Sequence, residues 1–225
     1  MIKALAFLVK LPRLSDAAFF GHWRHPHGTL TRRIPQFRRY VQNHRIGDVP
    51  GFATGPWLGV PAIWLDDLAA LADAQVHPEY APLDADGDNM YIRDRTVWLV
   101  GNETIVRAQA ADAAAMPIKA ILMLGNGNGT ALADAAAVLD LTKELAETLS
   151  GIVGASVTLP VDPTAPSPCA ALIELSFGDC AAFDAAWDDG RAVLNSVARL
   201  ADLPNSHGIL VREERVIWPK PSGDC

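Results

Sequence analysis

The sequence has little cysteine, no surplus of positive charge and no long apolar run. Its 225 residues include 3 cysteines, whose spacing matches no zinc motif and which cannot all pair within one chain. We therefore expect a reduced, cytoplasmic protein. The formal net charge of −7 argues against a nucleic-acid partner or an anionic membrane surface, because both attract positive charge. The apolar stretch at residues 4–9 is far too short to span a membrane.

The composition favours a folded protein with a sizeable core. Hydrophobic residues make up 50% of the chain and charged residues 20%, which excludes a disordered chain. Six arginines and no carboxylate lie between Ala17 and Gly47. The favoured interpretation of this run is a solvated basic face. The alternative is a rim that attracts a carboxylate or enolate ligand.

Three short segments recur in the same order further along the chain, at offsets of 112 to 120 residues. Residues 1–4, 65–71 and 95–98 match residues 117–120, 177–183 and 215–218. We therefore predict two repeats, residues 1–107 and 116–225, joined by an alanine-rich stretch.

Each repeat has the same predicted order of elements, β-α-β-β-α-β. In the first, Ser15 is a suitable N-cap for a helix with apolar residues at spacings of three and four, which Pro26 should kink or split. Its strands are predicted at 2–9, 37–46, 61–65 and 95–100, with a helix at 66–75 and a loop at 84–88. The second repeat has predicted strands at 118–124, 156–161, 170–177 and 209–218, and helices at 131–149 and 181–200.

One such unit forms a four-stranded antiparallel sheet with both helices on one face, the ferredoxin-like arrangement. The other face of the sheet is apolar and bare. We expect an α+β protein in which two tandem βαββαβ repeats bury their bare faces against each other.

Several segments of the first repeat resemble the EthD domain, a family named for ethyl tert-butyl ether degradation. They are residues 22–27 (HWRHPH), 39–44 (RYVQNH), 64–68 (WLDDL), 77–80 (HPEY) and 93–98 (RDRTVW). The resemblance covers most of residues 1–105 and implies an intrachain version of the dimeric α/β barrel. Relatives with that fold include cofactor-free monooxygenases, cyclases, lactone isomerases and heme-degrading enzymes.

The second repeat lacks the histidines and tryptophan of these motifs, so we expect any functional pocket within residues 1–105. His27 lies on the apolar stripe of its helix, where an imidazole can act as a general acid or base. The alternative is a core histidine that is bonded to the backbone. Tyr40, Gln42 and His44 share one face of their strand, because side chains alternate. That face meets either the helices, together with His27, or the other repeat.

The predicted catalytic residues are His27, His44 and Tyr40. The predicted substrate-binding residues are Trp23, Gln42, Asn43, Trp64 and Tyr80. Trp64 and Tyr80 are expected to form a flat apolar wall, although aromatic residues are more often core packing. No metal site is predicted, because the closely spaced histidines at 22 and 25 have no glutamate beside them. No cofactor is predicted either.

The leading hypothesis is a cofactor-independent enzyme for a small apolar or aromatic oxygenated substrate. His27 would transfer a proton, while His44 and Tyr40 orient it or stabilise an enolate. Isomerisation, cyclisation, dehydration and oxygenation all fit. The alternatives are a non-catalytic binding or accessory protein of an ether or xenobiotic oxidation system, and a heme binder. A homodimer is compatible with the sequence.

Overall fold

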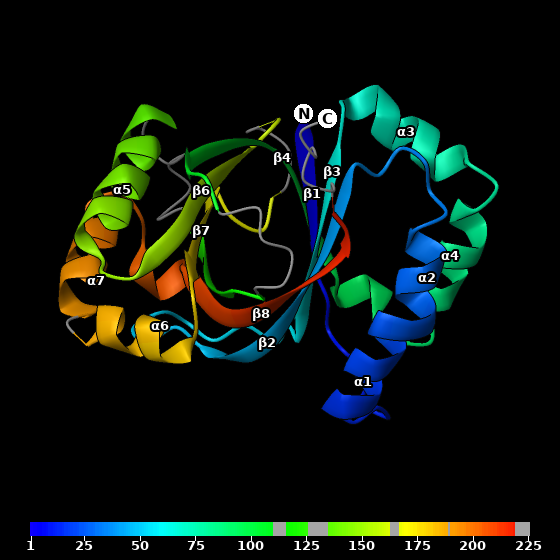
Figure 1. The fold of residues 1–225 in the computed structure, drawn as a ribbon, viewed down its shortest axis with the longest axis horizontal. Coiled ribbons are helices and arrows are strands. Elements are labelled where there is room, and N and C mark those ends of the chain that lie inside the picture. The colour runs from blue at the N-terminus through cyan, green and yellow to red at the C-terminus, as the bar shows by residue number, and fades with distance from the viewer. Residues whose placement is uncertain (110–115, 126–134, 163–166, 189, 219–225) are drawn as a thin grey trace, which may run out of the picture. The chain divides into compact units, whose positions relative to one another are not determined.

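The computed structural model describes residues 1–109, 116–125, 135–162, 167–188 and 190–218 (Figure 1). The chain divides into two compact units. The first unit contains residues 1–44, 56–98 and the chain from Glu214 onward. The second unit contains residues 45–55 and 99–213. Three strands, β2 (Arg39–Asp48), β4 (Val97–Arg107) and β8 (His207–Ile217), run from one unit into the other, so the units do not coincide with consecutive halves of the sequence.

The first unit follows the predicted order of strands and helices up to its last helix, whereas the strand predicted at 95–100 is β4 (Val97–Arg107), most of which belongs to the second unit. Its elements are β1 (Ile2–Phe7), α1 (Asp16–His22), the irregular turn η1 (Trp23–His27), α2 (Gly28–Thr31), β2 (Arg39–Asp48), β3 (Gly59–Leu65), α3 (Leu68–Val76), α4 (Tyr80–Gly87) and η2 (Arg93–Arg95). Strand β3 pairs antiparallel with both β1 and β2. The helices lie on one side of this sheet (Figure 1).

The first helix begins and breaks where the sequence indicates. Ser15 is the N-cap, and its hydroxyl oxygen accepts a hydrogen bond of 3.1 Å from the Ala18 amide. The helical backbone is interrupted at His25, directly before Pro26, with φ −146° and ψ 124°. The predicted split at Pro26 is therefore confirmed, and it produces the separate elements α1, η1 and α2.

The second unit contains a larger antiparallel sheet, in the order β8-β5-β7-β6-β4. Its elements are β4 (Val97–Arg107), β5 (Ile118–Leu124), α5 (Ala135–Thr148), β6 (Ile152–Pro160), β7 (Ala171–Phe177), α6 (Cys180–Trp187), α7 (Gly190–Ala198), η4 (Leu203–Asn205) and β8 (His207–Ile217). Strands β5 and β7 are buried along their whole length. They form the centre of an aliphatic core with α5 and α6.

Two predictions about helices were wrong. Residues 84–88 belong largely to α4, because Pro82 is tolerated in the first turn of a helix and alanine and leucine favour its interior. The single helix predicted at 181–200 is two helices, α6 and α7. At Gly190 an added Cβ would lie 2.9 Å from the Trp187 ring, so the second helix starts in close contact with the first.

The second unit also buries an ionic cluster. The Lys119 ammonium lies 3.3 Å from a Glu174 carboxylate oxygen and 2.5 Å from a Glu213 oxygen. All three side chains are buried and come from β5, β7 and β8. Burial alone would lower the pKa of Lys119, but the two carboxylates outweigh it and raise the pKa. Lys119 is therefore held in its charged form.

Candidate functional site

Tyr40, Gln42 and His44 face the helices of the first unit. The Trp23 indole N–H donates a hydrogen bond of 2.8 Å to the Tyr40 hydroxyl, and the Gln42 amide donates one of 2.7 Å to the Trp23 carbonyl. The His44 ring stacks on the Trp23 indole, with centroids 4.9 Å apart. Of the two orientations that the sequence left open, the structure has the one that turns these side chains toward the helices.

Trp23 is at the centre of this group of side chains and contacts Tyr40, Gln42 and His44. It is buried, and its ring packs so closely on β3 that a Cβ added at Gly59 would lie 2.4 Å from it. Burial raises the pKa of the Tyr40 hydroxyl to about 12, against the opposite effect of hydrogen bonds from Trp23, Gln42 and Thr31. Tyr40 is therefore a neutral phenol throughout the physiological range.

His44 is enclosed by two aromatic rings. It stacks on Phe20 at a centroid distance of 4.5 Å, with Trp23 as the second stacked ring. Its Nε2 lies 3.2 Å from the Gln42 side-chain oxygen. Its Nδ1 lies 3.9 Å from a carboxylate oxygen of Glu214, at the end of β8. The imidazole is thus fixed in orientation and has polar groups at both nitrogens.

His27 has a different environment, on the side of η1 that faces α4. Its Nδ1 lies 2.9 Å from Asp86, and the second oxygen of that carboxylate lies 2.9 Å from His22 Nε2. Burial lowers the pKa of His27, although Asp86 opposes the shift. Burial would raise the pKa of Asp86, but the hydrogen bonds to both histidines lower it overall. Near neutral pH this pair is a neutral imidazole next to an ionised carboxylate.

This charge state assigns the proton on His27. An ionised carboxylate can only accept hydrogen bonds, so the His27 Nδ1 must carry the hydrogen that it donates to Asp86. The lone pair then lies on Nε2. No hydrogen bond to this Nε2 is formed by any residue that the structure describes. The pair therefore has the geometry of a carboxylate that orients a general base.

The two imidazole clusters are connected through backbone and hydroxyl groups. The Thr31 hydroxyl donates a hydrogen bond of 2.9 Å to the His27 carbonyl and also bonds the Tyr40 hydroxyl. In the described part of the chain, no hydrogen bond joins the imidazoles of His27 and His44 directly. Tyr40 and Thr31 hold the turn that carries His27, while His44 lies further along the same strand face.

The remaining predicted site residues lie elsewhere. Asn43 pairs with Val60 across β2 and β3, and its amide donates a hydrogen bond of 2.8 Å to the Val60 carbonyl. By the alternation of side chains, Asn43 and Trp64 share the sheet face opposite to His44. The Lys3 ammonium lies 4.6 Å from the Trp64 ring centroid on that face. Tyr80 begins α4 and is partly buried, so burial raises its pKa.

Sequence reasoning missed Asp86 and Glu214. Asp86 belongs to a run of alternating acids that predicts a loop. In the structure this run lies on α4, which places the Asp86 carboxylate next to the histidines. Glu214 is distant from His44 in the sequence and lies in the predicted second repeat, where no chemistry was expected. The helical spacing of residues 80–87 could have indicated Asp86, whereas no local signal marks Glu214.

Most arginines of the basic run are paired with carboxylates or backbone. Arg24 forms a two-point ion pair with Glu214, Arg38 bonds Asp66 through its Nε at 3.0 Å, and Arg33 bonds Glu79 at 3.3 Å. Arg38 and Asp66 are exposed to solvent. These contacts favour the solvated basic face over a rim for an anionic ligand.

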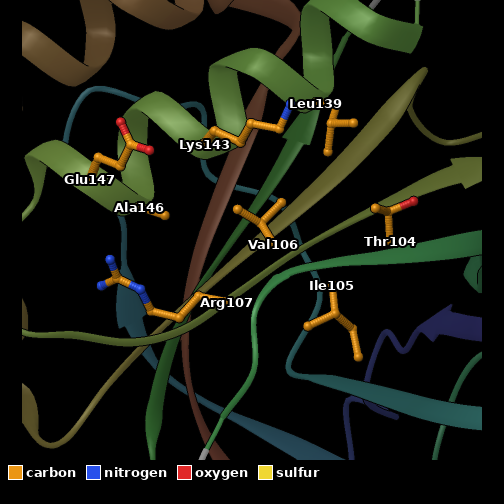
Figure 2. Close-up of a pocket in the computed structure, with 8 residues that line it drawn as sticks. All are labelled: Thr104, Ile105, Val106, Arg107, Leu139, Lys143, Ala146 and Glu147. Carbon is orange, nitrogen blue, oxygen red and sulfur yellow. The ribbon is translucent and has the colours of Figure 1, made fainter.

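A pocket of about 390 Å³ lies in the second unit, between the end of β4 and α5 (Figure 2). Its wall residues are Thr104, Ile105, Val106, Arg107, Leu139, Lys143, Ala146 and Glu147. The strand register shifts between Ile105 and Arg107, which lets consecutive residues of β4 line the same hollow. None of the predicted site residues lines this pocket.

Within the described ranges, no group of three or more histidine, cysteine, aspartate or glutamate side chains is arranged to hold a metal ion. Among the helices described, none is both long and apolar enough to cross a membrane.

Comparison with known families gives a direct assignment for the first part of the chain. Residues 11–94 match the EthD domain, and this range contains α1, β2 and α4 with both imidazole clusters. This part of the chain is similar to the EthD domain. The resemblance seen in the sequence motifs is therefore confirmed. Among curated proteins, no match to the sequence was found.

Solved structures extend the likeness beyond the EthD domain to nearly the whole chain. A candidate monooxygenase from Fusobacterium nucleatum subsp. nucleatum is 7% identical, with a TM-score of 0.60 over 95% of this chain and 92% of that one. An anthrone oxidase-like protein is 10% identical, with a TM-score of 0.59 over 100% and 96%. A chlorite dismutase variant from Candidatus Nitrospira defluvii is 6% identical, with a TM-score of 0.53 over 96% and 91%.

At these identities the likeness shows the fold alone. It is a mixed α/β fold that this chain shares with these proteins, which confirms the predicted fold class at that level.

Proposed function

We propose that the EthD domain is a small-molecule enzyme of oxidoreductase type that removes a proton from an enolisable, apolar or aromatic carbonyl compound. The observation that carries this proposal is the pairing of the partly buried, neutral His27 with ionised Asp86. A general base works best when it is neutral near the operating pH and is held in one tautomer. The Asp86 hydrogen bond supplies the second condition.

In the proposed reaction, His27 Nε2 accepts a proton from the carbon next to the substrate carbonyl. The C–H bond breaks and its electron pair moves to the carbonyl oxygen, which gives an enolate and an imidazolium. Asp86 stabilises the imidazolium through the Nδ1 hydrogen bond. The enolate is then reprotonated at another position, as in an isomerase, or oxidised by dioxygen, as in a monooxygenase.

Tyr40 and His44 have supporting roles in this proposal. Tyr40 bonds Thr31, which in turn bonds the His27 carbonyl, so Tyr40 positions the turn that carries the base. His44 provides a second imidazole on the same side of the sheet. Trp23, Gln42, Asn43, Trp64 and Tyr80 remain proposed substrate-binding residues, with Asn43 and Trp64 on the opposite sheet face from the others.

The names of the fold relatives support a carbonyl substrate that forms an enolate. One is an anthrone oxidase-like protein and one a candidate monooxygenase. Anthrone is an aromatic ketone whose CH₂ group loses a proton to give a stabilised enolate. We further propose that residues 1–107 and 116–225 are two ferredoxin-like repeats of an intrachain α/β barrel. In this proposal the protein works in the cytoplasm, where it can form a homodimer.

The test is deuterium incorporation into anthrone in D₂O without oxygen, which measures proton removal apart from oxidation. The protein should speed the exchange above the buffer rate, and His27→Gln should abolish the gain. The matched control is His77→Gln, because the His77 ring accepts a backbone hydrogen bond from Glu79 and contacts no carboxylate in the described part of the chain. Exchange at the buffer rate with the parent protein, or full exchange with His27→Gln, would contradict the proposal.

A further inference from the structure

We propose that Glu214 is a positioning residue for His44: its carboxylate faces Nδ1, the nitrogen that accepts a proton, and stabilises the resulting imidazolium. The inference rests on the proposed function for the reaction that this imidazole serves. It adds that the last strand of the chain, β8, supplies a residue that the EthD domain itself does not contain.

The first step is the orientation of the Gln42 amide. Its nitrogen lies 2.7 Å from the Trp23 carbonyl oxygen, a contact that only the NH₂ end of the amide can make. The amide oxygen must therefore be the atom that lies 3.2 Å from His44 Nε2. Because an amide oxygen only accepts, His44 Nε2 carries a hydrogen. In the neutral ring the lone pair is then on Nδ1.

The second step is that the ring cannot turn to exchange its nitrogens. Phe20 and Trp23 cover its two faces, at interplanar angles of 10° and 14°. The His44 side chain is only 7% exposed. Its Nδ1 is thus held toward Glu214.

The third step is the charge that Nδ1 faces. A Glu214 carboxylate oxygen lies 3.9 Å from Nδ1, close enough for charge attraction but too long for a direct hydrogen bond. Arg24 bonds both oxygens of this carboxylate, which raises the pKa of the guanidinium. His22, at the end of the adjoining helix α1, bonds Asp86 instead. Glu214 is therefore a charged group next to His44, and Arg24 acts on His44 through that carboxylate.

The arrangement around His44 can take up one proton at Nδ1. With neutral His44, the charge of Glu214 is balanced by Arg24. When Nδ1 takes a proton, the carboxylate stabilises two cations, and the Nε2 hydrogen bond to Gln42 is kept. His44 can thus accept or return a proton without any change in its orientation.

Histidine NMR on the ¹⁵N-labelled full-length protein tests this without a substrate. The neutral His44 ring should carry its hydrogen on Nε2. At the pH where His44 of the parent protein is half protonated, Glu214→Gln should lower the ratio of charged to neutral ring about three- to tenfold. Arg24→Gln should raise the same ratio, because it frees the carboxylate. Glu147→Gln, a carboxylate on α5 of the second unit, is the matched control and should change nothing.

Hydrogen on Nδ1 of the neutral ring would overturn the proposal. An unchanged ratio of charged to neutral His44 in both Glu214→Gln and Arg24→Gln would also overturn it. Two variants are used so that the test still holds if one of them fails to fold. An equal shift in Glu147→Gln would show a general charge effect and would also overturn it. If His27→Gln keeps full anthrone exchange while these NMR results hold, the proposed function fails and the assignment of Glu214 stands.

Discussion

The two units differ in the polar groups that they bury. Around Trp23, the first unit buries a phenol and an amide and encloses two imidazoles. The second unit buries an ammonium between two carboxylates. Burial lowers the pKa of His27, so that it is neutral near pH 7, whereas the carboxylates raise the pKa of Lys119.

This difference separates groups that can exchange a proton from groups that cannot. An imidazole that is neutral near pH 7 can take up a proton and release it again. An ammonium held between two carboxylates stays charged at any physiological pH and stabilises only the fold. Proton chemistry is therefore expected in the first unit.

The largest expected effect is on proton removal in the first unit. Asp86→Asn should lower the enzyme-catalysed exchange of anthrone by roughly two to four orders of magnitude, because an amide no longer holds His27 in the required tautomer. Asp73→Asn, an exposed change on α3, should leave the exchange rate unchanged. Equal rates for Asp86→Asn and the parent would remove Asp86 from the mechanism.

The matching experiment in the second unit concerns stability. Lys119→Met should lower the free energy of unfolding by about 3–5 kcal/mol, because it leaves buried carboxylates without their cation. Chemical denaturation measures this loss. Lys143→Met, whose ion pair with Asp140 is exposed, should be nearly neutral. Similar curves for the two variants would show that the buried cluster adds no stability to this unit.

A smaller loss is expected at the closest packing contact of the first unit. Gly59→Ala would place a methyl group 2.4 Å from the Trp23 ring, so the indole must move. Overpacking of this kind costs roughly 1–3 kcal/mol. Thermal unfolding measures the cost, and the near-UV circular dichroism of Trp23 reports the movement. Gly21→Ala is the control, because an added Cβ at Gly21 has no neighbour within 4 Å.

The smallest expected effect is on the pH dependence of stability. The pKa of His27 is lower in the folded chain than in the unfolded chain, so the unfolded chain binds more protons as the pH falls below about 6.5. The stability that His27 contributes is present above that pH and is lost toward its folded pKa. For one proton, the free energy of unfolding cannot change by more than about 1.4 kcal/mol per pH unit. Denaturation at pH 7 and pH 5 should show a smaller loss for His27→Gln than for the parent.

Local sequence signals predicted much of the fold and part of the site. The cap at Ser15, the break at Pro26 and the shared face of Tyr40, Gln42 and His44 all depend on spacing within one element, which a sequence displays directly. The partners of the two imidazoles depend instead on contacts between elements that are separate in the sequence. Asp86 required a helix where acids and a glycine indicated a loop, and Glu214 required the register of long strands far apart in the chain.

The most direct test is to measure anthrone exchange and thermal unfolding on the same His27→Gln preparation. Glutamine keeps a hydrogen-bonding side chain at this position but cannot accept a proton near neutral pH. If His27 is the base, exchange should fall by roughly two to four orders of magnitude while stability changes little. A variant with normal exchange but a stability loss of about 1–3 kcal/mol would show that His27 is a structural residue.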